Sequence, residues 1–143
     1  MSLRYRTDAP ADEPAVTLDS FLDQEDAVSV RIEAGDDVRL LLHLLDRVKL
    51  VEIDFPRFRD GRGYSSARIL REAGYTGELK ATGDVLVDEL LFMRRCGFDS
   101  FAPDAPIAPE AAERALNAYP YVYQHAADDA VPVWKLRHGQ PRA

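Results

Sequence analysis

A cluster of arginines interrupts an otherwise acidic sequence. The segment from Pro56 to Arg68 contains four arginines and one acid, Asp60, so its local charge is +3 while the net charge of the chain is −7. Guanidinium groups bind oxyanions through paired hydrogen bonds, and glycines at a helix start let backbone N–H groups approach such a ligand. The segment therefore predicts a pocket for a small oxyanion or a phosphoryl group. Its candidate ligand-binding residues are Arg57, Arg59, Arg62, Tyr64, Ser65 and Arg68.

A second interpretation of the same arginines stays open. They would pair with the abundant carboxylates, either locally or across a subunit interface, and Gly61 and Gly63 would only shape the turn. The segment has neither the Gly-Lys-Ser/Thr ending of a Walker loop nor the glycine spacing of a Rossmann fingerprint. It therefore indicates no particular nucleotide, and the sequence predicts no cofactor.

Asp54 is the candidate catalytic residue, because it ends a predicted strand directly before the arginines. A carboxylate there can act as a general base, and a salt bridge is its alternative role. The acids Asp84, Asp88 and Asp104 fit helix capping better than metal binding. No two histidines have the i, i+4 spacing of a metal pair, so the sequence predicts no metal site.

The composition restricts the class of protein. A chain of 143 residues with 46% hydrophobic residues can form one domain with a continuous core. The acidic charge argues against binding to nucleic acids or to an anionic membrane surface. Cys96 is the only cysteine, which excludes an intramolecular disulfide, and we expect it to be a buried thiol. No stretch approaches the roughly 18 apolar residues of a membrane span, so we expect a cytoplasmic protein.

Hydrophobic periodicity predicts four successive strand–helix units. The expected strands are 28–32, 50–55, 78–82 and 98–102, and the expected helices are 38–48, 64–73, 85–96 and 109–118. Asp84 is expected to cap the third helix, and Gly74 and Gly97 are expected to end the second and third. Residues 7–14 show no apolar period and predict an extended or flexible arm. The chain thus divides into an arm and lead-in over residues 1–27 and one α/β domain over residues 28–143.

This alternation of strands and helices predicts an α/β fold with a mainly parallel sheet and right-handed crossovers. Four such units resemble half of a β/α barrel, and they fit an open sheet with helices on both faces equally well. In both folds ligands bind at the carboxyl ends of the strands, where Asp54 and the arginines are expected to lie. A four-stranded parallel sheet needs cover on both faces, so a homodimer is also expected. The aromatic tail, residues 121–143, would pack on the domain or contact a partner.

Two long stretches, FPRFRDGRGYSSARILRE and GYTGELKATGDVLVDELLFMRRCGFDSF, together with the acidic arm before them, resemble an uncharacterised bacterial family, domain of unknown function 934. The resemblance extends over roughly residues 28 to 125. Members of that family tend to be encoded beside assimilatory sulfite reductase and carry the label of oxidoreductase. The resemblance therefore implies an accessory role in sulfur assimilation and sulfite reduction, with sulfite reductase components as partners. The chain lacks the four cysteines of a cluster coupled to sirohaem and any flavin or nicotinamide motif, so it cannot be the reductase itself.

Three functions follow from these observations. The first is an accessory protein of sulfur assimilation that binds sulfite, sulfate or a sulfated nucleotide at the Arg57 to Arg68 segment. The second is a structural or interaction protein that acts as a homodimer. The third is a small enzyme in which Asp54 is the base and the arginines stabilise negative charge.

Overall fold

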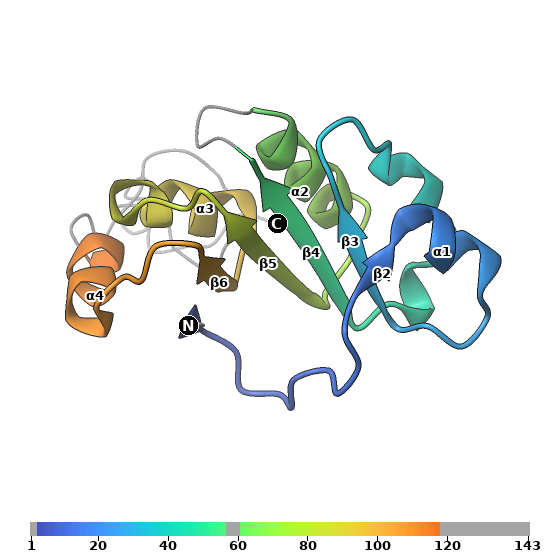
Figure 1. Ribbon diagram of the computed structural model, residues 1–143, viewed down its shortest axis with the longest axis horizontal. Helices are drawn as coiled ribbons and strands as arrows, with labels where there is room; N and C mark the ends of the chain where they lie inside the picture. The colour runs from blue at the N-terminus through green and yellow to red at the C-terminus, as the bar shows by residue number, and fades with distance from the viewer. Residues whose placement is uncertain (1–2, 57–60, 118–143) are drawn as a thin grey trace, which may run out of the picture.

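The computed structural model describes residues 3–56 and 61–117, which form one open sheet flanked by helices (Figure 1). The strand order is β1-β6-β5-β4-β3-β2, in which β1 is antiparallel to β6 and every other neighbouring pair is parallel. The sheet is open and does not close into a barrel. The strands are β1 (Leu3–Arg4), β2 (Val16–Thr17), β3 (Ser29–Ile32), β4 (Leu50–Phe55), β5 (Glu78–Gly83) and β6 (Ser100–Pro103).

The helices connect these strands in chain order. Four are α-helices and three are short 3-10 helices within the described residues. They are α1 (Leu18–Asp23), η1 (Val38–Leu41), η2 (Leu45–Arg47), α2 (Arg62–Glu72), η3 (Val87–Glu89), α3 (Leu90–Cys96) and α4 (Pro109–Asn117). None of these helices is long and apolar enough to cross a membrane. The predicted tail, residues 121–143, lies outside the described residues.

The predicted helix at 38–48 is wrong, because the segment forms the two 3-10 helices η1 and η2. The apolar residues Val38, Leu41 and Leu44 recur at every third position, which matches the period of a 3-10 helix as well as one face of an α-helix. Arg47 then fixes the second turn, since its Nη2 donates to the carbonyl oxygens of Phe21 and Gln24 at 2.9 and 2.6 Å.

The third predicted helix starts later than expected, and Asp84 does not cap it. Leu86 occupies the N-cap position of η3, and no side chain caps this end. Gly83, with φ +91°, turns the chain at the end of β5, and Asp84 lies in this turn with its backbone N–H bonded to the Phe55 carbonyl oxygen at 2.7 Å. Because of this turn, the first helical residue is Val87 and not residue 85. Gly97 ends α3 as predicted, in the left-handed conformation with φ +116°.

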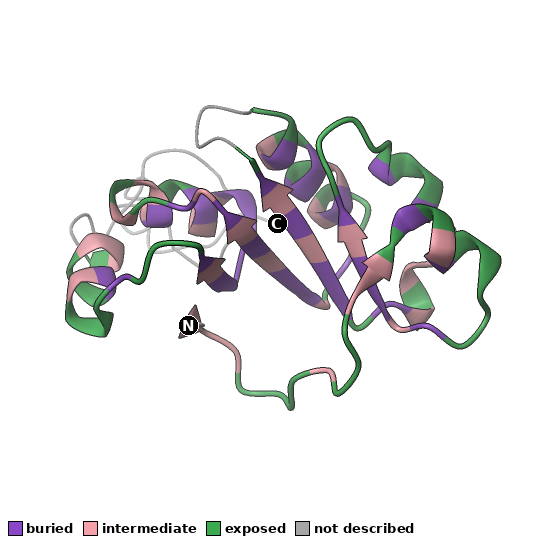
Figure 2. Ribbon diagram, viewed as in Figure 1, coloured by how far each residue is buried: buried purple, intermediate pink, exposed green. Residues whose placement is uncertain are grey.

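The core lies on one face of the sheet. Alternate residues of the parallel strands point to this face, and the register aligns them in rows, Val30, Val51 and Leu79 in one and Ile32, Ile53, Ala81 and Phe101 in the next. These side chains form one cluster with core residues of α1, α2 and α3. No strand residue from the opposite face belongs to the cluster, so the described helices cover one face only. Figure 2 shows the result as alternating buried and intermediate bands along β4 and β5.

Arg71, at the end of α2, joins this helix to the loop before β5 and to the segment after α3, at the amino ends of the strands. Its side chain is 13% exposed. Nε and Nη2 donate to the Gly97 carbonyl oxygen at 3.1 and 2.8 Å, and Nη1 donates to those of Tyr75 and Gly77 at 2.8 Å each. Nη2 also lies 3.1 Å from Oδ2 of Asp99. One guanidinium group thereby satisfies two carbonyl groups of the loop before β5 and the carbonyl group of Gly97, which ends α3.

The N-terminal segment is attached to the same region. Because β1 and β2 lie at opposite edges of the sheet, residues 5–15 pass along the amino ends of the strands, as Figure 1 shows. Nη1 of Arg6 contacts Oδ2 of Asp99 at 2.7 Å, and Nε of Arg4 contacts Oε1 of Glu78 at 2.9 Å. Both carboxylates are buried, so these ion pairs fix the segment against the sheet.

We predict that Arg71→Lys destabilises the fold by about 3 kcal/mol, because an ammonium group cannot reach the four acceptors and leaves buried oxygens unpaired. Urea unfolding at pH 7 measures the change. Arg68→Lys is the matched control, since Arg68 is exposed on the same helix and its substitution should cost less than about 0.5 kcal/mol. Equal stability of the two variants would contradict the role assigned to Arg71.

Candidate ligand-binding site

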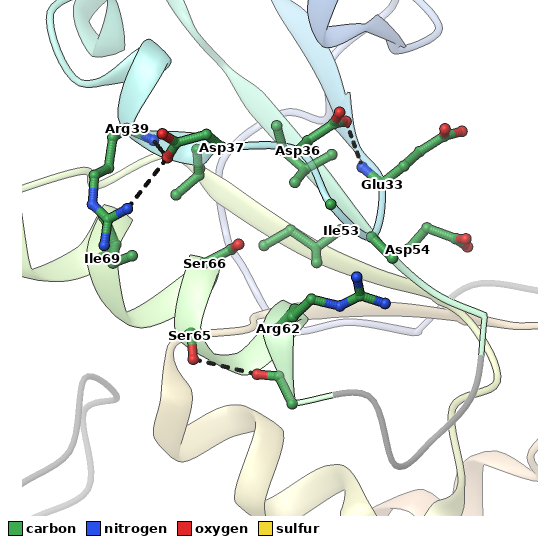
Figure 3. A pocket seen from close by; sticks show the side chains of 16 residues that line it. Glu33, Asp36, Asp37, Arg39, Ile53, Asp54, Arg62, Ser65, Ser66 and Ile69 are labelled. Carbon is green, nitrogen blue, oxygen red and sulfur yellow. Dashed lines mark hydrogen bonds and ion pairs between the residues drawn. The ribbon is translucent and has the colours of Figure 1, made fainter.

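A crevice of about 590 Å³ opens at the carboxyl ends of β3 and β4. One wall is the loop between β3 and η1, and the other is the start of α2 (Figure 3). Ile53 and Asp54 of β4 line it between the two walls. Carboxyl ends of parallel strands are the usual place for ligands in α/β proteins, so this crevice is the candidate site.

The start of α2 presents backbone donors to the crevice. The first hydrogen bond within the helix runs from the Ser65 N–H to the Gly61 carbonyl oxygen at 3.2 Å, so the N–H groups of the three preceding residues have no acceptor within the helix. No side chain caps this end. Gly63 also has a packing role, because a Cβ atom there would lie 2.5 Å from the Phe55 ring. The glycine lets α2 approach β4 closely.

The structure separates the predicted ligand-binding residues into two groups. Arg62 and Ser65 line the crevice together with Ser66 and Ile69, which are the positions i, i+3, i+4 and i+7 of one helix face. The Ser65 hydroxyl donates to the Gly61 carbonyl oxygen at 3.4 Å. Arg68 is exposed and does not line the crevice. Arg57 and Arg59 lie outside the described residues. Helical spacing alone could have separated Arg62 from Arg68.

Tyr64 points to the other side of α2, between two phenylalanines. Its ring centroid is 5.1 Å from that of Phe55 and 5.0 Å from that of Phe92. The phenol oxygen is buried and has no hydrogen-bond partner within the described part of the chain. Burial raises the pKa of Tyr64 to about 12. Tyr64 is therefore an aromatic packing residue between α2 and α3.

The opposite wall is acidic, which the sequence analysis did not predict. Oδ2 of Asp36 accepts the Glu33 backbone N–H at 2.9 Å, and Oδ1 of Asp37 accepts the Arg39 N–H at 3.0 Å and caps η1. The sequence did contain a signal for this loop, because Gly-Asp-Asp after a strand is typical of a turn followed by a helix cap. The described lining thus has two arginines, at 39 and 62, against four carboxylates, at 33, 36, 37 and 54. Three of the four carboxylates, at 33, 36 and 37, lie on the wall opposite α2.

Asp54 makes polar contacts on the sheet face opposite the core. Thr82 donates from Oγ1 to Oδ1 of Asp54 at 3.1 Å, and Nη2 of Arg31 lies 3.6 Å from the same oxygen. This is the salt-bridge role that the sequence left as the alternative. A role for Asp54 as a general base stays a prediction.

The remaining candidates lie away from the crevice lining. Asp88 is in the first turn of η3 and exposed, and Asp104 is exposed after β6. Cys96 is buried in the core at the end of α3, as predicted. Within residues 3–56 and 61–117 no group of three or more histidines, cysteines or acids could hold a metal ion.

A family model described as a bacterial protein of unknown function (DUF934) matches residues 29–134, which is most of the chain. The chain belongs to the DUF934 family. The match begins at β3 and includes both walls of the crevice, whereas β1, β2 and α1 precede it. No curated protein matches the chain.

We predict that Tyr64→Phe leaves stability at pH 7 unchanged or raises it by up to about 1 kcal/mol, because it removes a buried hydroxyl without a partner. The pKa of Tyr64 is higher in the folded protein than the ordinary value near 10. Its contribution to the free energy of unfolding is therefore fully present below pH 10 and is lost as the pH rises through about 12. The advantage of the variant should therefore grow between pH 7 and pH 11. Urea unfolding at both pH values tests this, and a loss of stability at pH 7 would reveal a partner of the hydroxyl.

Proposed function

We propose that this DUF934 protein is a small accessory protein of sulfur assimilation that binds an oxyanion-bearing ligand in the crevice at the ends of β3 and β4. The observation that carries the proposal is the wall formed by the start of α2. Arg62, Ser65 and Ser66 line this wall beside the uncapped helix start. A strand end, a helix start and an arginine together form a common setting for anion recognition.

The α2 wall can hold an oxyanion by several interactions at once. The helix has 11 residues, so its dipole places partial positive charge at the crevice. Backbone N–H groups of the first turn would donate to the oxyanion, Arg62 would add charge-assisted hydrogen bonds, and the Ser65 hydroxyl can turn from the Gly61 carbonyl oxygen to the ligand.

The acidic wall selects against a bare oxyanion. The carboxylates of Glu33, Asp36 and Asp37 repel a second negative charge, but they accept hydrogen bonds from hydroxyl groups. A ligand with an oxyanion at one end and hydroxyl groups at the other satisfies both walls. Among the candidate ligands, a sulfated nucleotide has this form, because its ribose hydroxyls accompany the phosphate and sulfate groups. Sulfite and sulfate lack the second part.

The assignment to sulfur assimilation rests on what the family resemblance implies, namely that the gene lies beside those of assimilatory sulfite reductase. Affinity capture tests it, with the tagged full chain taken from cells that grow on sulfate as their only sulfur source. Recovery of sulfite reductase components by mass spectrometry supports the accessory role. Recovery of the protein alone contradicts a stable complex with the reductase.

We predict that adenosine 5′-phosphosulfate binds more tightly than sulfate or sulfite in calorimetric titrations of the full chain. Arg62→Gln should weaken the binding of adenosine 5′-phosphosulfate at least about tenfold, because it removes charge-assisted hydrogen bonds to the oxyanion. Arg68→Gln is the matched control, and its affinity should stay within about twofold because Arg68 is exposed outside the crevice lining. Absence of binding at millimolar ligand, or an equal loss in both variants, contradicts the proposed site.

A homodimer is the second candidate function, and the sheet face that the described helices do not cover favours it. Parallel sheets are almost always covered on both faces, whereas the described helices of this chain cover one. Light scattering should give twice the chain mass of 16.0 kDa. A strict monomer at all concentrations removes this candidate.

A further inference from the structure

The side chains that line the crevice follow one another in the same direction along both walls. Along α2 the lining runs from Arg62 at the helix start to Ile69 two turns later. Along the opposite wall it runs from Glu33 to Arg39, and Figure 3 shows Arg39 beside Ile69, away from Arg62. Because η1 packs against α2, Arg39 and Ile69 together form one end of the crevice. We call these two residues and Asp37 the far end.

The distance between the two ends suits a nucleotide. Arg62 and Ile69 are seven residues apart, which corresponds to about 10 Å along an α-helix. A nucleotide has a similar length from its phosphate group to the outer edge of its base. With an oxyanion at Arg62 and the helix start, a base reaches the far end. The ribose then lies between them, beside Asp36 and Ser66.

Arg39 presents a planar group at the far end. Its side chain is 68% exposed, and its Nη1 lies 3.6 Å from Oδ1 of Asp37. This carboxylate offsets the guanidinium charge and repels anions, so a second oxyanion is disfavoured there. The flat faces of a guanidinium group stack on aromatic rings and on bases. Ile69 is partly buried against the core and adds an apolar contact from the α2 wall, so the far end suits a flat ring.

Asp37 places a hydrogen-bond acceptor at the same end. Its Oδ1 accepts the Arg39 backbone N–H at 3.0 Å, which caps η1 and holds the carboxylate in place. The side chain is 53% exposed, and an ionised carboxylate only accepts hydrogen bonds. The amino group of adenine can donate to it. The oxo group that hypoxanthine carries in the same place is an acceptor and is repelled.

We propose that Arg39 and Ile69 hold the base of a nucleotide whose oxyanion binds at the start of α2, and that Asp37 selects a base with an amino group. This inference rests on the oxyanion site proposed above and adds the part of the ligand that the far end recognises. The guanidinium of Arg39 stacks on one face of the ring, and Ile69 contacts the other face.

Three ligands that share a 5′-phosphate test the inference in calorimetric titrations of the full chain. They are adenosine 5′-phosphate, inosine 5′-phosphate and ribose 5-phosphate. Adenosine 5′-phosphate should bind at least about fivefold more tightly than inosine 5′-phosphate, since only its amino group donates to Asp37. Ribose 5-phosphate should bind most weakly, because it has no base. Equal affinities for adenosine 5′-phosphate and ribose 5-phosphate would overturn the proposal.

Arg39→Lys separates stacking from charge, because lysine keeps the positive charge and lacks the planar group. It should weaken the binding of adenosine 5′-phosphate at least about fivefold and leave that of ribose 5-phosphate within about twofold. Arg68→Lys is the matched control, since Arg68 is exposed on α2 outside the crevice lining. Equal effects of the two variants contradict a base at Arg39.

Asp37→Asn tests the selection of the base. Asparagine is also a preferred N-cap residue, so η1 keeps its cap. Its side-chain amide both donates and accepts, so the preference for adenosine over inosine 5′-phosphate should fall below about twofold. An unchanged preference excludes Asp37 as the selecting residue.

Nuclear Overhauser spectra locate the base directly. The chain has four isoleucines, at positions 32, 53, 69 and 107, and each gives one δ1-methyl signal after selective ¹³C labelling. With bound adenosine 5′-phosphosulfate, we expect a contact from H2 or H8 of the adenine to the Ile69 methyl group. Contacts to other isoleucines without one to Ile69 would overturn the proposal.

The outcomes separate this inference from the oxyanion site. A chain that does not bind adenosine 5′-phosphosulfate overturns both. Binding that depends on Arg62, while Arg39→Lys behaves like Arg68→Lys, overturns the base at the far end and leaves the oxyanion site in place. Thermal melting of each variant establishes that it is folded.

Discussion

The order of the parallel strands along the sheet is also their order along the chain, and this constraint determines where everything else lies. Each right-handed crossover returns to the neighbouring strand, so every connecting helix falls on the same side of the sheet. The hydrophobic core then draws one set of alternate residues from β3, β4, β5 and β6, and the other set is mainly polar, with Leu50 and Ala102 as its apolar members. A sheet with helices on both faces would need the strand order to reverse, and between β2 and β6 it does not.

The amino and carboxyl ends of the strands make different kinds of contact. At the amino ends, Arg71, Asp99 and Arg6 connect the helix ends, the loop before β5 and the N-terminal segment through buried hydrogen bonds. At the carboxyl ends, α2 begins without a side-chain cap, and Gly63 brings its first turn against β4. The buried hydrogen bonds that stabilise the fold thus lie at the amino ends, whereas backbone donors without an acceptor in their helix lie at the carboxyl ends.

The central elements were predictable from the sequence because their hydrophobic patterns are strong. The four parallel strands β3 to β6 and helices α2 and α4 lie within a few residues of their predicted positions. The edge strands β1 and β2 have two residues each, too short for any periodic signal, and they form only because the edges of β6 and β3 are open. The arginine segment was predicted as a unit, but α2 rotates each residue by about 100°, so Arg62 and Arg68 point in different directions. The acidic wall was missed because Asp36 and Asp37 belong to a loop that meets α2 only in three dimensions.

Ligand binding between the β3–η1 loop and the start of α2 is the central claim, and amide chemical shifts test it most directly. Full-length ¹⁵N-labelled protein is titrated with adenosine 5′-phosphosulfate and followed by ¹H–¹⁵N correlation spectra. Concentration-dependent shifts are expected at Arg62, Gly63 and Ser65 on one wall and at Gly35 on the other. Shifts confined to the amino ends of the strands, near Lys49 and Gly77, or no shifts at millimolar ligand, would contradict the proposed site.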